Sequence, residues 1–162
     1  MNNQPNKKII QPDQLLDLVK QLKAKGKRVV SLNGSFDLLH AGHLYMIEEA
    51  KKQGDILILA LNSDDSIKRY KSPLRPIISL NDRMQMIAAL EKVDYVTFFD
   101  EIDPREVLKK IEPDVHVNGL EYGQDCIEAQ TVKELGGTLY LVPRIEGLST
   151  SSIIKKIKSL CD

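Results

Sequence analysis

Cysteine, net charge and long apolar runs are all scarce in this chain of 162 residues. The two cysteines, Cys126 and Cys161, lie far apart and make no C-x-x-C pair. Together with the missing secretory signal, this usage predicts a cytoplasmic protein. No apolar run is long enough to span a membrane. Lysine plus arginine and aspartate plus glutamate number 23 each, and a chain without a basic excess is not expected to bind nucleic acid.

Several common motifs are absent as well. The sequence has no Walker A loop, no G-x-G-x-x-G run and no G-x-S-x-G nucleophile elbow. No histidines, cysteines and aspartates cluster at metal-ligand spacing, so we expect no protein-held metal. No repeat, linker or low-complexity segment divides the chain, and a hydrophobic content of 42% suffices for one core. We therefore expect a single domain over residues 1–162, with a flexible segment at residues 1–10.

Helical and strand-like patterns alternate along the chain. Five apolar runs predict strands, at residues 28–32, 55–61, 93–99, 115–118 and 138–142. Amphipathic segments predict helices, at residues 11–25, 44–54, 83–90, 104–111, 127–135 and 153–160, with a short helix after 62–64. This order predicts an α/β, Rossmann-like, doubly wound parallel five-stranded sheet with helices on both faces.

Polar clusters follow four of these predicted strands, at residues 33–43, 62–64, 118–122 and 144–152. Because the carboxyl ends of parallel strands meet at one edge of a sheet, we expect these clusters to lie together there. Ligands bind such sheets at this edge, at a switch point of the strand order. Gly34 and Gly42 would let the backbone approach a phosphate without a Cβ in the way.

The densest of these clusters contains His40-Ala41-Gly42-His43, at a junction from strand to helix. The free N–H groups of a helix start attract anions. Histidines at that point can add directed donors to the oxygens of a reacting phosphate. The sequence therefore predicts a site that binds and stabilises phosphate groups.

Two segments carry a family resemblance. Residues 34–43 resemble the first motif of the nucleotidylyltransferase superfamily with the HxGH signature, and residues 146–151 resemble its second motif. The resemblance extends over about residues 28–158. Within the superfamily, residues 61–64, 71–76, 81–84 and 90–94 are most similar to the adenylyltransferase domain of heptose 1-phosphate metabolism.

This resemblance implies an enzyme that transfers AMP from ATP to D-glycero-β-D-manno-heptose 1-phosphate, giving ADP-heptose for lipopolysaccharide-type glycans and pyrophosphate. The acceptor phosphate would attack in line, without a covalent enzyme intermediate. Mg²⁺ would arrive with the nucleotide, held mainly by its oxygens and water. A homo-oligomer is also implied, together with a separate upstream sugar kinase, because the kinase often fused to this domain is missing here.

The implied site residues fall into three groups. The catalytic group is His40, His43 and Lys71. The nucleotide-binding group is Gly34, Ser35, Phe36, His40, Gly42, His43, Arg83, Asn118, Gly119, Glu121, Ser149, Thr150 and Ser151. The substrate-binding group is Asp37, Asn62, Asp64, Arg75 and Arg144.

Several of these residues have a plainer alternative. Lys71 and Arg83 are equally typical of solvated surface charge, and Ser149 to Ser151 of an ordinary helix cap. Asp37 is better suited to ordering its loop through hydrogen bonds to the backbone than to acting as a base. His116, inside a predicted strand, is more typical of a core histidine than of a ligand.

Two other functions stay open. The first is a cytidylyltransferase that acts on glycerol 3-phosphate or a similar polyol phosphate. Residues 143–147 are closer to the second motif of those enzymes, although they carry an arginine where Glu91 stands. The chain also departs from the heptose enzymes at residues 118–122, where it has Asn-Gly-Leu-Glu-Tyr and they have Lys-Gly-Gly-Asp-Tyr. A nucleotide-binding sensor without turnover is the third hypothesis, and the intact His40 and His43 argue against it.

Overall fold

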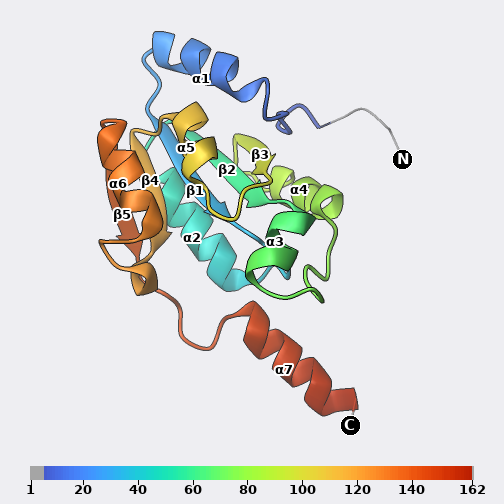
Figure 1. The fold of residues 1–162 in the computed structure, drawn as a ribbon. Helices are drawn as coiled ribbons and strands as arrows, with labels where there is room; N and C mark the ends of the chain where they lie inside the picture. Colours follow the sequence, from blue (N-terminus) through green and yellow to red (C-terminus); the bar gives the residue numbers. More distant parts are fainter. Residues whose placement is uncertain (1–5, 162) are drawn as a thin grey trace.

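The computed structural model describes residues 6–161. Figure 1 shows a central sheet with helices around it. The strands are β1 (Val29–Gly34), β2 (Ile56–Asn62), β3 (Tyr95–Phe99), β4 (Val115–Gly119) and β5 (Thr138–Val142). The helices are α1 (Leu15–Ala24), α2 (Ala41–Lys51), α3 (Asp64–Tyr70), α4 (Leu80–Ala88), α5 (Arg105–Ile111), α6 (Ile127–Glu134) and α7 (Thr150–Cys161), with a 3₁₀ turn η1 (Leu120–Tyr122).

All strand pairs in this sheet are parallel, and their order is β3-β2-β1-β4-β5. The chain therefore builds outward from β1 to one side through β2 and β3, and to the other through β4 and β5. The switch point lies between β1 and β4, where Leu32 pairs with Val117. The predicted doubly wound α/β fold is confirmed, and its binding edge is the one where these strands end.

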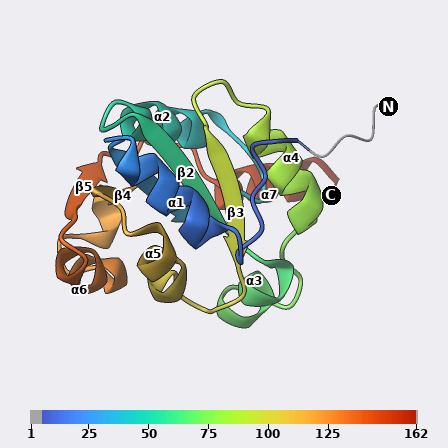
Figure 2. The same ribbon diagram turned by 90° about the horizontal axis from the view of Figure 1, so that it is seen from above.

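Two hydrophobic layers hold the helices on opposite faces of the sheet. Successive strand residues point to opposite faces, so Val30 packs toward α2 and α4, whereas Val29 packs toward α1 and α5. Figure 2 shows α1 and α5 lying over the sheet on the near side. Buried Ile47 of α2 and Val107 of α5 belong to these two separate clusters. Both faces of β2 are likewise covered, which is why its residues 56–61 are continuously apolar.

The segment at residues 7–10 differs from the prediction of a flexible N-terminus. The N–H of Val96 donates to the carbonyl of Lys8 at 2.8 Å, and the N–H of Ile10 donates to the carbonyl of Val96 at 2.8 Å. The Lys8 ammonium also donates to the carbonyl of Val93 at 2.7 Å. These residues cover the edge of β3, which would otherwise leave its backbone groups unpaired. Residues 1–5 of the predicted flexible segment lie outside the described residues.

Serine side chains cap the first turns of two helices and so set where these helices begin. The short helix predicted after residues 62–64 is α3, and the Ser63 side chain caps it by accepting a hydrogen bond from the N–H of Ser66. Helix α4 begins earlier than predicted, because Ser79 caps it by accepting from the N–H of Asp82. Within residues 6–161, no helix combines the length and the apolar character that a bilayer crossing requires.

A buried polar pair joins β1 to β4. His116 is 0% exposed, and its Nδ1 lies 2.7 Å from the Oγ of Ser31, its neighbour in the strand register. Its Nε2 is buried without a hydrogen-bond partner. Burial lowers the pKa of His116 to about 4, because the low-dielectric core disfavours the charged imidazolium. The prediction of a core histidine is confirmed.

The buried His116 makes the stability of the fold sensitive to acid. Below pH 6.5 the unfolded chain binds a proton at this imidazole, whereas the folded chain does so only near pH 4. The contribution of His116 to the free energy of unfolding should therefore fall as the pH drops through this window, by about 2 kcal/mol at pH 5 relative to pH 8. Urea unfolding at several pH values measures this loss. A Ser31→Ala, His116→Leu double variant should lose less over the same window, and an equal loss would contradict this assignment.

Candidate active site

A cavity of about 600 Å³ opens at the carboxyl edge of the sheet, where the polar clusters were predicted to meet. It is lined by the segments that follow β1, β2, β4 and β5. The predicted residues that line it are Gly34, Ser35, Phe36, His40, Gly42, His43, Asn62, Lys71, Asn118, Gly119, Glu121, Arg144, Ser149, Thr150 and Ser151. Fifteen positions from five separate segments of the chain therefore share one cavity.

The two histidines are stacked at the start of α2. Their ring centroids are 3.9 Å apart, and Phe36 packs against His43 with a centroid distance of 5.2 Å. His40 is the N-cap of α2, and its backbone N–H donates to Nδ1 of His43 at 3.4 Å. Since Nδ1 of a neutral His43 then accepts, its proton is on Nε2. His43 can therefore donate a hydrogen bond from Nε2.

Both histidines are held neutral. Burial, reinforced by the nearby His40 and Lys71, lowers the pKa of His43 to about 4. Burial and the positive charge of Arg144 also lower the pKa of His40. A neutral imidazole can donate a hydrogen bond to a ligand and leaves no uncompensated positive charge in the empty site. The pair is thus a set of fixed dipolar donors at neutral pH.

Close backbone packing keeps this pair in place. A Cβ at Gly42 would lie 3.0 Å from the His40 ring and 3.4 Å from the Cβ of Leu148. The start of α2 therefore lies directly against the segment between β5 and α7. At Gly119 a Cβ would meet the far end of the flexible Glu121 side chain, which can move aside. The close approach at Gly42 is therefore the one that favours a residue without a side chain.

Further donors flank the histidines. The Lys71 ammonium donates to Oγ of Ser35 at 2.7 Å. Partial burial lowers the pKa of Lys71, and the guanidinium groups of Arg75 and Arg83 act in the same direction. Helix α7 begins at the cavity, and Oγ of Ser149 accepts from the N–H of Ser152 at 3.0 Å. The predicted cap is therefore present, and the helix start can face an anion as well.

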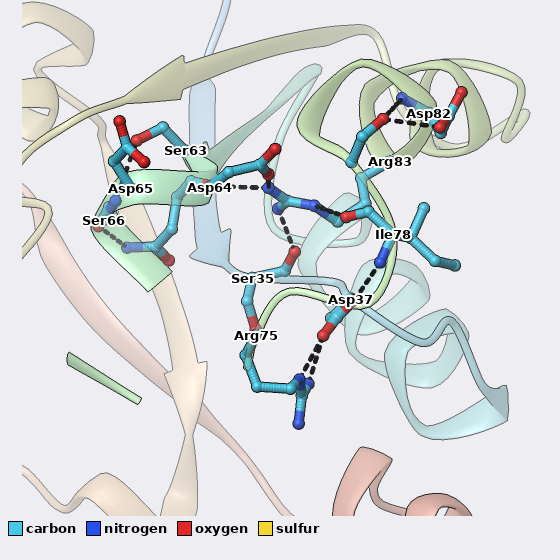
Figure 3. A network of polar contacts seen from close by, with 12 residues as sticks. Ser35, Asp37, Ser63, Asp64, Asp65, Ser66, Arg75, Ile78, Asp82 and Arg83 are labelled. Carbon is cyan, nitrogen blue, oxygen red and sulfur yellow. Dashed lines mark hydrogen bonds and ion pairs between the residues drawn. The ribbon is translucent and has the colours of Figure 1, made fainter. Parts of the chain in front are cut away.

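Arg83, predicted to bind nucleotide, needs a correction. Its side chain is 0% exposed and lies outside the cavity. Figure 3 shows its guanidinium enclosed between three segments of the chain. It donates to the carbonyls of Ile78, Ser35 and Asn62 at 3.0, 2.6 and 3.0 Å, and to the Asp64 carboxylate at 2.7 Å. All three of its nitrogens are engaged, so Arg83 stabilises the fold.

Three predicted substrate-binding residues belong to the same network instead of the cavity lining. Asp64 pairs with Arg83. Asp37 is buried, and it accepts from Nε of Arg75 at 2.6 Å and from the N–H groups of Ile77 and Ile78 at 2.8 and 2.9 Å (Figure 3). Burial alone would raise the pKa of Asp37, but these hydrogen bonds outweigh it and lower the pKa. Asp37 therefore orders the loop at residues 71–79, as the alternative interpretation predicted.

Other residues lining the cavity were missed by the sequence analysis. They include Tyr70, at the end of α3, and Ile127 and Glu128, at the start of α6; Tyr122 of η1 also lines it and belongs to the predicted cluster at residues 118–122. The sequence did contain a signal for the residues at the start of α6. Each helix that follows a parallel strand begins at the binding edge, so the first turn of α6 was a candidate once β4 was assigned.

The arrangement is suited to polyphosphate chemistry. Neutral imidazole donors, two cations and a helix start surround the space in front of the His pair. Donors fixed in this way stabilise charge that develops on a transferring phosphoryl group. They also position the reacting groups.

Comparisons with known proteins agree with this geometry. The family model described as Cytidylyltransferase-like matches residues 31–158. The chain is 44% identical over 152 residues to the bifunctional protein HldE of Wolinella succinogenes, with 93% of this chain and 31% of that protein covered. It is 43% identical over 153 residues to HldE of Methylobacillus flagellatus, with 94% and 31% covered. The chain thus spans about a third of the length of these curated relatives.

Two solved structures share the fold. The lipopolysaccharide core biosynthesis protein of Thermoplasma volcanium is 30% identical with a TM-score of 0.60, covering 74% of this chain and 98% of that one. Pantoate-β-alanine ligase of Francisella tularensis is 17% identical with a TM-score of 0.64, covering 93% and 76%. At that identity the second match concerns the fold alone.

The buried Arg83 network predicts a large loss of stability on truncation. Arg83→Ala leaves Asp64 and three carbonyls without their donor, and should lower the free energy of unfolding by about 3–5 kcal/mol. Urea unfolding measures the change. Arg105→Ala, which removes an exposed arginine paired with Asp103, is the matched control and should unfold like the wild type. An Arg83→Ala variant as stable as this control would contradict the assigned role.

Proposed function

The chain belongs to the cytidylyltransferase-like family, and we propose that its cavity transfers AMP from ATP to a sugar phosphate. The proposed acceptor is D-glycero-β-D-manno-heptose 1-phosphate, with ADP-heptose and pyrophosphate as products. The observation that carries the proposal is the neutral His40–His43 pair at the helix start inside the cavity. The resemblance to the heptose adenylyltransferase domain and the 44% identity to an HldE protein support the choice of acceptor.

The reaction is a single in-line displacement. A phosphate oxygen of the acceptor forms a bond to the α-phosphorus of ATP, and the bond from that phosphorus to the bridging oxygen of pyrophosphate breaks. The attacking phosphate is already an anion, so the enzyme needs neither a nucleophile nor a general base. Its task is to hold the two substrates in line and to stabilise negative charge on the transferring group and the leaving pyrophosphate.

The proposed roles follow from the positions of the donors. Nε2 of His43 donates to an oxygen on the α-phosphorus, where charge grows in the transition state. The start of α7, at Ser149 to Ser151, binds the β- and γ-phosphates, which become the leaving group. Lys71 and Asn62, on the β2 side of the cavity, face the acceptor phosphate and sugar. Both reactants would therefore meet in front of the His pair.

A magnesium ion fits this site as a companion of the nucleotide. The cavity lining around the His pair includes the Lys71 ammonium and the hydroxyls of Ser149 to Ser151, which can donate to phosphate oxygens. We propose that Mg²⁺ enters on the triphosphate, held by its oxygens and by water. When bound, it supplies positive charge to the polyphosphate. The protein's own residues supply orientation and donors.

A cytidylyltransferase acting on glycerol 3-phosphate is the second candidate. The observation that favours it is Arg144, which lies in the cavity within the segment that resembles those enzymes. Its charge is close enough to act on both His40 and Tyr122. A nucleotide sensor without turnover is the third candidate, and the fixed donors at the His pair argue against it.

Substrate choice is tested by pyrophosphate release with Mg²⁺, combining ATP or CTP with heptose 1-phosphate or glycerol 3-phosphate. We expect turnover with ATP and the heptose, and a loss of about 10²–10³ in kcat for His43→Ala, because one transition-state donor is removed. Turnover with CTP and glycerol 3-phosphate would favour the second candidate. Nucleotide binding with no turnover in any combination would favour a sensor.

Lys68, three residues before Lys71, provides the control for a test of the role of Lys71. Lys71→Ala should lower kcat by about 10–100-fold, because a charge facing the reacting phosphates is lost. Lys68 lies outside the cavity lining, is exposed and pairs with Asp65, so Lys68→Ala should keep the wild-type rate. Initial rates of pyrophosphate release measure both. Equal rates for the two variants would remove Lys71 from the proposed mechanism.

A further inference from the structure

We propose that Glu128 recognises the exocyclic amino group of the nucleobase and so makes the cavity selective for adenine over its 6-keto analogue. The inference rests on the proposed function, and it deepens that function by naming the residue that selects the nucleotide.

Glu128 is an unusual residue for its position. It is 6% exposed, yet it lines the cavity as the second residue of α6. The start of a helix favours a carboxylate, but burial makes strong hydrogen-bond donors necessary as well. The donors beside it are the Asn118 amide, with Nδ2 3.4 Å from Oε2, and the Cys126 thiol. A long amide contact and a weak thiol donor leave this carboxylate under-satisfied.

The charges of the cavity indicate which ligand group reaches Glu128. Lys71, Arg144 and the His pair line the same cavity as Glu128. A triphosphate is drawn to the two cations and repelled by the carboxylate. The other end of the nucleotide, its base, then lies toward Glu128.

The surroundings of Glu128 also fit a base. Tyr122 is 65% exposed and Ile127 is 53% exposed, and both line the cavity. Large apolar side chains that remain open in a cavity offer contact area to the flat face of an aromatic ring. The buried carboxylate next to them would meet the edge of that ring. A single polar group among apolar side chains in a cavity is an arrangement that gives specificity.

A carboxylate distinguishes an amino group from a keto group by hydrogen-bond chemistry. A carboxylate can only accept hydrogen bonds. The 6-amino group of adenine donates to it, whereas the 6-keto oxygen of hypoxanthine would face it as a second acceptor. Purine riboside triphosphate, which has only a hydrogen at this carbon, forms no bond and meets no repulsion. The expected order of affinity is therefore ATP, then purine riboside triphosphate, then inosine triphosphate.

Calorimetric titration of the full chain with Mg²⁺ and without acceptor tests this order, because nucleotide can then bind without turnover. The wild type should bind ATP about 10–100-fold more tightly than inosine triphosphate, the range expected for a hydrogen bond to a charged group. Glu128→Gln can rotate its amide to donate, so the ratio should fall to about 3-fold or less. Glu134→Gln, on the same helix but outside the cavity lining, should keep the wild-type ratio.

The outcomes separate this inference from the proposed function. Equal binding of ATP and inosine triphosphate by the wild type overturns the role of Glu128 even if no variant folds. An unchanged ratio in Glu128→Gln, or an equal weakening of all three nucleotides, also overturns it while leaving nucleotidyl transfer intact. A wild type that binds no nucleotide overturns both. A selective loss of the ATP preference, with the melting temperature kept, supports the assignment.

Discussion

The buried guanidinium of Arg83 is the interaction on which the geometry of the binding edge depends. It joins the loop after β1 through Ser35, the end of β2 through Asn62 and the start of α3 through Asp64. A second ion pair, between Arg75 and Asp37, fastens the loop at residues 71–79 to the same region. Four charged residues that the resemblance implied as ligand contacts thus hold in place the segments that carry Ser35, Lys71 and the histidines.

This rigid frame explains the electrostatic state of the His pair. Because the loop after β1 is fixed, Phe36 and the α2 backbone bury His43 and lower its pKa. The same packing places Gly42 against Leu148, so the start of α7 lies beside the histidines. Donors from α2 and α7 are therefore preorganised around one point before a ligand arrives. The same contacts therefore stabilise the fold and hold the proposed catalytic donors in position.

The strands, their parallel direction and the edge that carries the cavity were all predictable, because apolar runs and strand-to-helix junctions are local patterns. The functions of Arg83 and Asp37 were not, since their partners are 48 and 38 residues away along the chain. A charged residue is almost never expected to be fully buried, and no local pattern reveals a partner of that kind. Residues 7–10 were missed for the same reason, because their hydrogen bonds are made to β3.

The central claim is that one cavity holds a nucleoside triphosphate with its α-phosphate at the His pair. A crystal structure with Mg²⁺ and α,β-methylene-ATP tests it most directly, because this analogue cannot transfer its adenylyl group. The account predicts Nε2 of His43 within hydrogen-bond distance of an α-phosphate oxygen, the β- and γ-phosphates at the start of α7, and the base between Tyr122 and Glu128. A triphosphate bound on the β2 side near Lys71, with the histidines free, would contradict it.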